Sequence, residues 1–361
     1  MASDSAAWRR FTLVAIGASL TSNDASKIHK NNVKPTVWGE YNEHPDVRAR
    51  SEVEINQWMK HNEVTMKGDN VPRPAFNFEE SSLDTLIINK LTNSYDDPTV
   101  IQSVSWPIAL SGRDMISVAQ TGSGKTLAFI LPGIMHATKQ GKCVYGEGPS
   151  VVVLVPTREL AQQVESVSKS FCSLMGVRCL CVYGGSARMV QSRNLVKGVD
   201  VLVATPGRLN DFLYANVIDL KRCSYLVLDE ADRMLDMGFE PQIRTIISTI
   251  SCARQTLMFS ATWPDDVRSL AHNYQNDPIF VNVGSLKLAA NPNIIQNILV
   301  ITEKEKEKRL LELLCQLNST YTFKIFPNSI NPGLGWPTSL LMLSIPGLAS
   351  NEICVNVGDE E

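Results

Sequence analysis

The fold of this chain is decided by the stretch Ala119-Gln120-Thr121-Gly122-Ser123-Gly124-Lys125-Thr126. It follows a short apolar run and opens an amphipathic one. Glycines let the backbone curl so that successive N–H groups point inward at the oxygens of a phosphate. The following helix adds the positive end of its dipole. The stretch therefore predicts a phosphate-binding loop between a strand and a helix, although Ala119 stands where the strict pattern has glycine.

The side chains at the end of this loop predict its ligand. Lys125 can reach the β- and γ-phosphates of a nucleotide, and the hydroxyl of Thr126 can bind Mg²⁺. The alternative is a structural turn that carries a lysine by chance. We expect a nucleotide site formed by Thr121, Gly122, Ser123, Gly124, Lys125 and Thr126.

Outward from the loop, short apolar segments alternate with longer amphipathic stretches between Phe76 and about Val283. Such alternation predicts an α/β fold, with a parallel sheet covered by helices on both faces. Ligands of such sheets gather at the carboxyl ends of the strands. The predicted helices are Thr126–Thr138, Arg158–Leu174, Met189–Lys197 and Asp265–Tyr274. The predicted strands are Met115–Ala119, Val151–Val155, Cys179–Val182, Val201–Ala204, Tyr225–Leu228, Thr256–Phe259 and Ile279–Val283.

One of these strands runs directly into the acidic segment Asp229-Glu230-Ala231-Asp232. A carboxylate at the end of a strand is how phosphate-loop enzymes hold Mg²⁺ opposite the loop. We therefore expect Asp229 on the metal side and Glu230 polarising the attacking water. The alternative is a helix start, where acidic residues favour the dipole.

At this point the sequence resembles the DEAD-box RNA helicases, whose name is spelled by residues 229–232. Further motifs of that family follow in the expected order, and together they cover residues 76–290. They are Phe78 with Pro98-Thr99-Val100-Ile101-Gln102, Pro156-Thr157-Arg158-Glu159-Leu160-Ala161, Gly184-Gly185, Thr205-Pro206-Gly207-Arg208 and Ser260-Ala261-Thr262. The resemblance implies a RecA-like domain that binds ATP and Mg²⁺ and acts as an ATP-dependent RNA helicase.

The resemblance also implies roles for single residues. Lys125, Asp229 and Glu230 would be catalytic. Gln102 would read the adenine edge. Phe78 would stack on the purine, with Phe76 as the alternative residue. The other interpretation of Phe78 is a residue of the hydrophobic core. Ser260 and Thr262 would couple hydrolysis to RNA, or else cap the next turn. A single RNA strand would be held, without reading its sequence, by Pro156, Thr157, Arg158, Gly184, Gly185, Thr205, Pro206, Gly207 and Arg208.

Composition limits the class of protein. The 361 residues carry 34 Lys and Arg against 37 Asp and Glu, a net charge of −3, so RNA would be bound by local rather than bulk positive charge. No apolar run approaches the ~20 residues of a membrane-spanning helix. Eight cysteines without a Cys-x-x-Cys pair indicate reduced thiols in the nucleus or cytoplasm. Besides RNA, the resemblance implies protein partners of a helicase complex and no membrane.

The expected organisation has four parts: a flexible arm over 1–75 with one helix around Ser51–His61, a RecA-like ATP-binding domain over 76–290, a connector helix over 291–317 and an atypical tail over 318–361. The arginine motif of a second helicase domain is absent from residues 291–361. We therefore expect a truncated helicase that is impaired in unwinding. The alternatives are a non-catalytic ATP- and RNA-binding module that competes with a full-length helicase, and a fragment without function.

Overall fold

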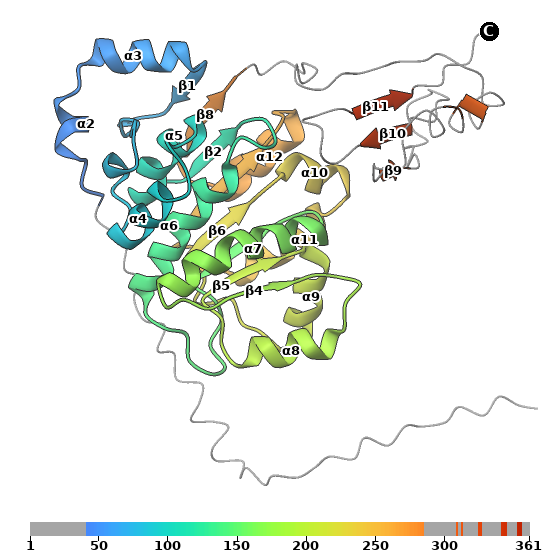
Figure 1. Ribbon diagram of the computed structural model, residues 1–361. Helices are drawn as coiled ribbons and strands as arrows, with labels where there is room; N and C mark the ends of the chain where they lie inside the picture. Colours follow the sequence, from blue (N-terminus) through green and yellow to red (C-terminus); the bar gives the residue numbers. More distant parts are fainter. Residues whose placement is uncertain are drawn as a thin grey trace, which may run out of the picture. The chain divides into compact units, whose positions relative to one another are not determined.

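The computed structural model describes residues 41–284 and the short segments 308–309, 312, 324–326, 341–344 and 352–355. The chain divides into two compact units, Met1–Leu286 and Lys287–Glu361. In the first unit, eight strands form one sheet in the order β1-β8-β2-β7-β6-β3-β5-β4 (Figure 1). Along the chain they are β1 (Val64–Lys67), β2 (Met115–Val118), β3 (Val151–Leu154), β4 (Cys179–Val182), β5 (Val201–Ala204), β6 (Tyr225–Leu228), β7 (Gln255–Ser260) and β8 (Ile279–Val283).

The predicted parallel sheet is confirmed. Strands β2 to β8 pair only in parallel with one another. Each predicted strand is present and agrees with the structure to within one residue at either end. Runs of Val, Ile and Leu allowed these strands to be predicted, because strands buried on both faces are apolar at every position.

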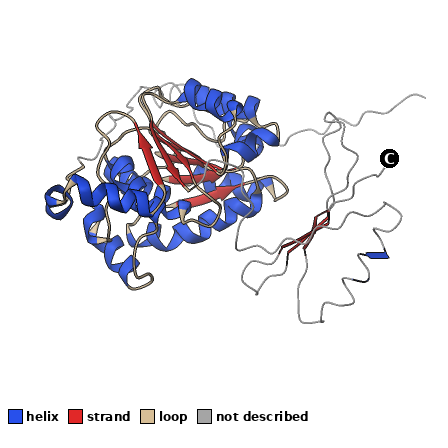
Figure 2. Cartoon of the chain, turned by 90° about the horizontal axis from the view of Figure 1, so that it is seen from above, coloured by secondary structure: helices blue, strands red, loops and turns tan. Residues whose placement is uncertain are grey.

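Helices cover both faces of the sheet (Figure 2). Residues Val151 and Val153 of β3 face a core shared with α5, α6 and α7, while Val152 and Leu154 face a core shared with α9, α11 and α12. The helices are α2 (Pro45–Ala49), α3 (Glu52–His61), η1 (Glu79–Ser81), α4 (Thr85–Thr92), α5 (Val100–Leu110), α6 (Lys125–Gln140), α7 (Arg158–Leu174), α8 (Arg188–Val196), α9 (Pro206–Tyr214), α10 (Ala231–Asp236), α11 (Glu240–Thr249) and α12 (Asp265–Tyr274). Because successive side chains of a strand point to opposite faces, each central strand contributes to both cores.

The described part of the predicted flexible arm is structured. Strand β1 pairs antiparallel with β8 and extends the sheet by one edge strand. The guanidinium of Arg50 donates two hydrogen bonds to the carboxylate of Glu80, at 2.8 and 3.0 Å. The ring of Trp58, on α3, stacks on Phe76 with centroids 4.9 Å apart. Residues 41–75 are therefore held by contacts with the domain that follows them, which is where the prediction of a flexible arm differs from the structure.

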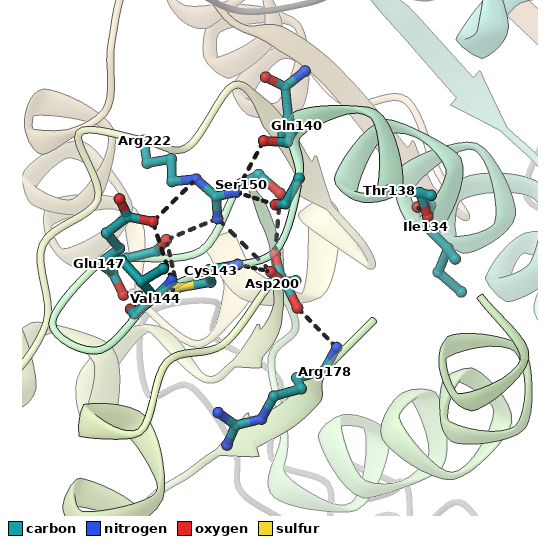
Figure 3. A network of polar contacts seen from close by, with 12 residues as sticks. Ile134, Thr138, Gln140, Cys143, Val144, Glu147, Ser150, Arg178, Asp200 and Arg222 are labelled. Carbon is teal, nitrogen blue, oxygen red and sulfur yellow. Dashed lines mark hydrogen bonds and ion pairs between the residues drawn. The ribbon is translucent and has the colours of Figure 1, made fainter. Parts of the chain in front are cut away.

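Polar side chains close the amino-terminal edge of the sheet. Asp200, just before β5, accepts hydrogen bonds from the backbone N–H groups of Cys143 at 2.7 Å and Arg178 at 2.9 Å (Figure 3). The guanidinium of Arg222 lies 3.8 Å from the same carboxylate and donates to the carbonyls of Gln140, Gly141 and Gly148. These contacts fix the loop that joins α6 to β3.

The second unit contains a three-stranded antiparallel sheet in the order β11-β10-β9. Its strands are β9 (Lys324–Phe326), β10 (Leu341–Ser344) and β11 (Glu352–Val355). Residues 308, 309 and 312 are helical. The rest of the predicted connector and tail lies outside the described residues. Among the described helices, none has the length and apolar character needed to cross a membrane.

Candidate functional site

The phosphate-type loop lies between β2 and α6, as predicted. Gly122 and Gly124 have φ angles of +79° and +93°, in the left-handed region that favours glycine. A Cβ at Gly124 would lie 2.7 Å from the amide nitrogen of Gln102, so a larger residue does not fit there. The Lys125 ammonium donates to the carbonyl of Ala119 at 2.9 Å and is buried. The loop is thus curled around a lysine that now bonds to its own backbone.

Gln102 ties the start of α5 to this loop. Its side-chain oxygen accepts from the N–H of Thr99 at 3.1 Å, and its side-chain nitrogen donates to the carbonyl of Gly124 at 3.1 Å. Both ends of the amide are therefore engaged by the protein. The structure places Gln102 beside the phosphate loop, where it supports the loop's shape.

The structure does not support a base-stacking role for Phe78. Its ring is 2% exposed and packs in the core, 6.1 Å from the ring of Trp106. The alternative, Phe76, is stacked on Trp58 and has the Arg50 guanidinium 3.8 Å above its ring. The sequence offered Phe78 and Phe76 as candidates for stacking. In the structure both rings are covered by other protein groups, so neither presents an open face to a base.

Sequence reasoning missed an exposed aromatic residue in the same region. Tyr95 is 52% exposed and lies in the turn between α4 and α5, seven positions before Gln102. Its place in the segment that leads to Gln102, rather than its exposure alone, makes it a candidate for contact with a base. The available signal was a tyrosine within the polar run that precedes Pro98.

The acidic segment begins where β6 ends. The N–H of Asp229 donates to the carbonyl of Leu154 at 3.0 Å, which extends the pairing with β3 and buries the Asp229 side chain. Burial raises the pKa of Asp229 to about 6, and the nearby charges of Glu230 and Asp232 add to the rise, while Lys125 opposes it. A cation bound next to such a buried acid would stabilise its ionised form. The oxygens of Asp229 and Thr126 are the ligand type that Mg²⁺ prefers, so the two residues fit such an ion.

Glu230 adopts a strained backbone conformation. Its φ and ψ are both 52°, a left-handed backbone conformation that residues other than glycine rarely adopt. Its carboxylate pairs with Arg233 at 3.1 Å, one turn further along α10. Strain of this kind often marks a functional position, because the surrounding fold must hold the residue there.

Thr262 makes the contact predicted to couple two parts of the site. Its hydroxyl donates to the carboxylate of Asp232 at 2.7 Å, and the same oxygen accepts from the N–H groups of Thr262 and Ala261 at 2.9 and 3.2 Å. Ser260 is fully buried, and its hydroxyl has no hydrogen-bond partner within the described part of the chain. Only one of the two predicted hydroxyls therefore bonds to the acidic segment in this structure.

A groove brings together most of the residues predicted to hold RNA. It lies where α7 and α9 begin, so the N-termini of two helices border it. Gly185 lies beside it, and a Cβ atom added at Gly185 would lie 3.6 Å from the Arg158 guanidinium. Pro206 is buried as the first residue of α9. The groove is lined by Pro156, Thr157, Arg158, Glu159, Gly184, Thr205, Gly207, Arg208, Asp211, Met237 and Phe239.

The two arginines of the groove differ in exposure. Arg158 is mostly exposed and pairs with its neighbour Glu159 at 2.6 Å. The Arg208 side chain is 10% exposed, donates to the carbonyl of Ser186 at 3.2 Å and lies 3.8 Å from the carboxylate of Asp211. One cation is thus exposed and paired with its neighbour in the chain, while the other is mostly buried and bonded to the groove.

The chain is similar to a known family and to named helicases. A family model described as DEAD/DEAH box helicase matches residues 99–270. The ATP-dependent RNA helicase DBP2 of Candida albicans is 51% identical over 275 residues, which cover 76% of this chain and 49% of that protein. DBP2 of Saccharomyces cerevisiae is 50% identical over 275 residues, with 76% and 50% covered. The chain thus spans about half the length of the curated relatives it matches.

Two solved structures share the fold. The crystal structure of the yeast DEAD-box splicing factor Prp28 matches with a TM-score of 0.63 and 30% identity, over 74% of this chain and 65% of that one. Prp28 of Chaetomium thermophilum bound to ADP matches with a TM-score of 0.62 and 34% identity, over 77% and 66%. Through the domain that carries these motifs, this chain belongs to the DEAD-box helicase family.

Proposed function

We propose that this chain is an RNA-dependent ATPase of DEAD-box type, which binds ATP at residues 119–126 and one RNA strand in the groove. The observation that carries the proposal is the shared sheet edge. Lys125 lies beyond β2, Asp229 follows β6, and the groove residue Thr157 follows β3. A nucleotide and an RNA strand bound at this edge would each contact loops anchored on the same rigid sheet.

ATP would be held by the backbone N–H groups of the loop and by Lys125. On binding, the ammonium of Lys125 would exchange the carbonyl of Ala119 for phosphate oxygens. Thr126 and Asp229 would hold Mg²⁺, which supplies neutralising charge to the phosphates when it is bound. The ion would also favour the ionised form of Asp229, against the effect of burial.

Glu230 is the residue we propose to orient the attacking water. Its carboxylate would release Arg233 and accept a hydrogen bond from that water. The left-handed backbone at Glu230 turns the chain between the end of β6 and the start of α10, so this carboxylate follows a different direction from Asp229. The two acidic side chains therefore serve different roles, one for the ion and one for the water.

We propose that Tyr95, in place of Phe78, offers the stacking face for the adenine ring. The proposal follows from its exposure, since Phe78 and Phe76 are both covered by protein groups. Gln102 would support the phosphate loop through Gly124 and reach the base edge by exchanging its bond to Thr99. An aromatic ring stacked on the base adds affinity because both faces bury apolar area.

RNA would be bound through its backbone. The start of α7, the start of α9 and the side chains of Arg158 and Arg208 would contact phosphates, and such contacts do not read sequence. The six cysteines of the described residues are free thiols, which fits our proposal that the protein resides in the nucleus or cytoplasm. We also propose that it works with protein partners of a helicase complex.

The test measures binding of a fluorescent ATP analogue and release of phosphate, with and without a U10 RNA. We expect Lys125→Ala to weaken nucleotide binding by at least about 10-fold, since a buried cation is lost. Glu230→Gln should bind the analogue normally but release no phosphate. Tyr95→Ala should weaken binding of the analogue, while Tyr214→Ala, at a still more exposed site on α9, should not.

The outcomes separate the functions. RNA-stimulated release that is lost in Glu230→Gln supports the ATPase. Binding of nucleotide and RNA without release by the unchanged chain would favour a competing, non-catalytic module. A chain that binds neither ligand would contradict the proposal.

A further inference from the structure

The groove has a nonpolar wall that none of the helicase motifs accounts for. Met237 and Phe239 line it, and both lie in the turn between α10 and α11, which follow β6 along the chain (Figure 1). The Met237 side chain is 49% exposed, whereas Phe239 is half-buried against the core beneath. An exposed thioether beside cationic groups is therefore part of the binding surface.

The turn holds Met237 in place through its backbone. The N–H of Gly238 donates to the carbonyl of Leu235 at 2.8 Å, and the N–H of Phe239 donates to the carbonyl of Met234 at 3.0 Å. Gly238 has a φ of +73°, which completes the helix-ending turn that these two bonds define. A side chain on such a fixed turn can pack against a ligand without first ordering the backbone.

The polar groups of the same groove come from two other helices. Thr157 and Arg158 lie at the start of α7, and Gly207 and Arg208 lie at the start of α9. These groups suit the phosphates of a nucleic acid, which alternate with riboses along the strand. A wall without charge has no partner among the phosphates, but it matches the C–H face of a ribose.

We propose that Met237, supported by Phe239, packs against a ribose of the RNA strand in the groove. The inference rests on the proposed function, because it assumes that the groove binds RNA. It assigns a nonpolar contact to a residue outside the phosphate-binding set. Such a contact is independent of base identity and of salt, whereas phosphate contacts weaken as salt rises.

The experiment measures the binding of three labelled 10-mers, U10, A10 and a ribose-phosphate strand without bases, over a range of salt. We expect Met237→Ala to weaken all three by about 3- to 10-fold, as expected for a few buried CH₂ groups. The slope of log Kd against log salt should stay unchanged. Met237→Leu should retain most of the affinity.

Two control variants identify the kind of contact. Arg208→Ala should lower the salt slope by about 0.7, since one phosphate contact to a single strand is lost. Leu86→Ala, which removes an equally exposed apolar side chain on α4, should bind like the unchanged chain. Thermal melting of each variant shows whether it is folded.

Equal binding by folded Met237→Ala and unchanged protein would overturn the ribose contact and leave the proposed function standing. A loss seen with U10 and A10 but not with the base-free strand would overturn it in favour of a base contact. If the unchanged protein binds none of the strands, both the RNA part of the proposed function and this inference fail.

Discussion

The two edges of the central sheet use polar side chains in opposite ways. At the amino-terminal edge, Asp200 accepts from two backbone N–H groups and lies near Arg222. Asp114, at the same edge, accepts from the N–H groups of Thr256 and Asn276, both at 2.7 Å. These carboxylates hold neighbouring loops together by accepting hydrogen bonds from the protein's own backbone.

At the carboxyl-terminal edge, comparable groups are left open. Within the described residues, the Asp229 carboxylate accepts a hydrogen bond from the adjacent N–H of Glu230, at 3.0 Å. The hydroxyl of buried Ser260 has no partner there, and Glu230 is held in a left-handed conformation. Buried polar groups are normally hydrogen-bonded, so this edge carries a cost that a bound ligand can offset. One edge stabilises the fold, and the other keeps groups available.

The largest effect that would test this comparison comes from Asp200→Ala. The change leaves the N–H groups of Cys143 and Arg178 unpaired and leaves Arg222 with Glu147, at 3.9 Å, as its remaining acidic neighbour. We expect the free energy of unfolding to fall by about 4 kcal/mol, measured with urea. Asp211→Ala, which removes an exposed acid beside the groove, should change it by less than about 0.5 kcal/mol. A loss below about 1 kcal/mol for Asp200→Ala would contradict the structural role of this edge.

The second effect follows from the pKa of Asp229, which burial raises from 3.8 to about 6. The folded state then binds the proton more tightly than the unfolded state, so protonation stabilises the fold. This contribution is present below about pH 4 and is lost as the pH rises through 6. Lys125 opposes the shift, and Glu230 and Asp232 add to it.

Comparison with Asp229→Asn isolates this titration. Between pH 4 and pH 8, the unchanged chain should lose about 2.5 kcal/mol of unfolding free energy relative to the variant. Urea unfolding of both proteins across this range, without nucleotide, measures the difference. A difference that is constant with pH would show that Asp229 is not desolvated in the folded state.

The position of the carboxyl-terminal edge could be predicted from the sequence. Strands β3 and β6 are runs of Val and Leu, and the motifs follow directly after them, so the carboxyl edge could be placed before the structure was known. Thr157 and Thr205 also follow buried strands, but their assignment to RNA came from the family resemblance, and the groove itself was not predicted.

Features that depend on distant contacts could not be predicted. Strand β1 is four residues long, and only its pairing with β8, far along the chain, makes it a strand. Phe78 and Tyr95 are both aromatic residues near the glutamine motif, but packing against Trp106 buries one and leaves the other exposed. The closing role of Asp200 likewise depends on loops that meet only in the folded protein.

The smallest expected effect comes from the strained residue of the open edge. Glu230→Gly relieves a left-handed backbone that costs a side chain roughly 1–2 kcal/mol, although glycine also loses more entropy on folding. We expect a net gain of about 1 kcal/mol in unfolding free energy, together with loss of phosphate release. Glu230→Gln is the matched control, since it removes the charge beside Asp229 but keeps the strain. If the gain came from relieved repulsion between the acids, the two variants would be equally stabilised. A larger gain for glycine would assign it to the backbone, and would show that the open edge gives up stability in order to position its carboxylate.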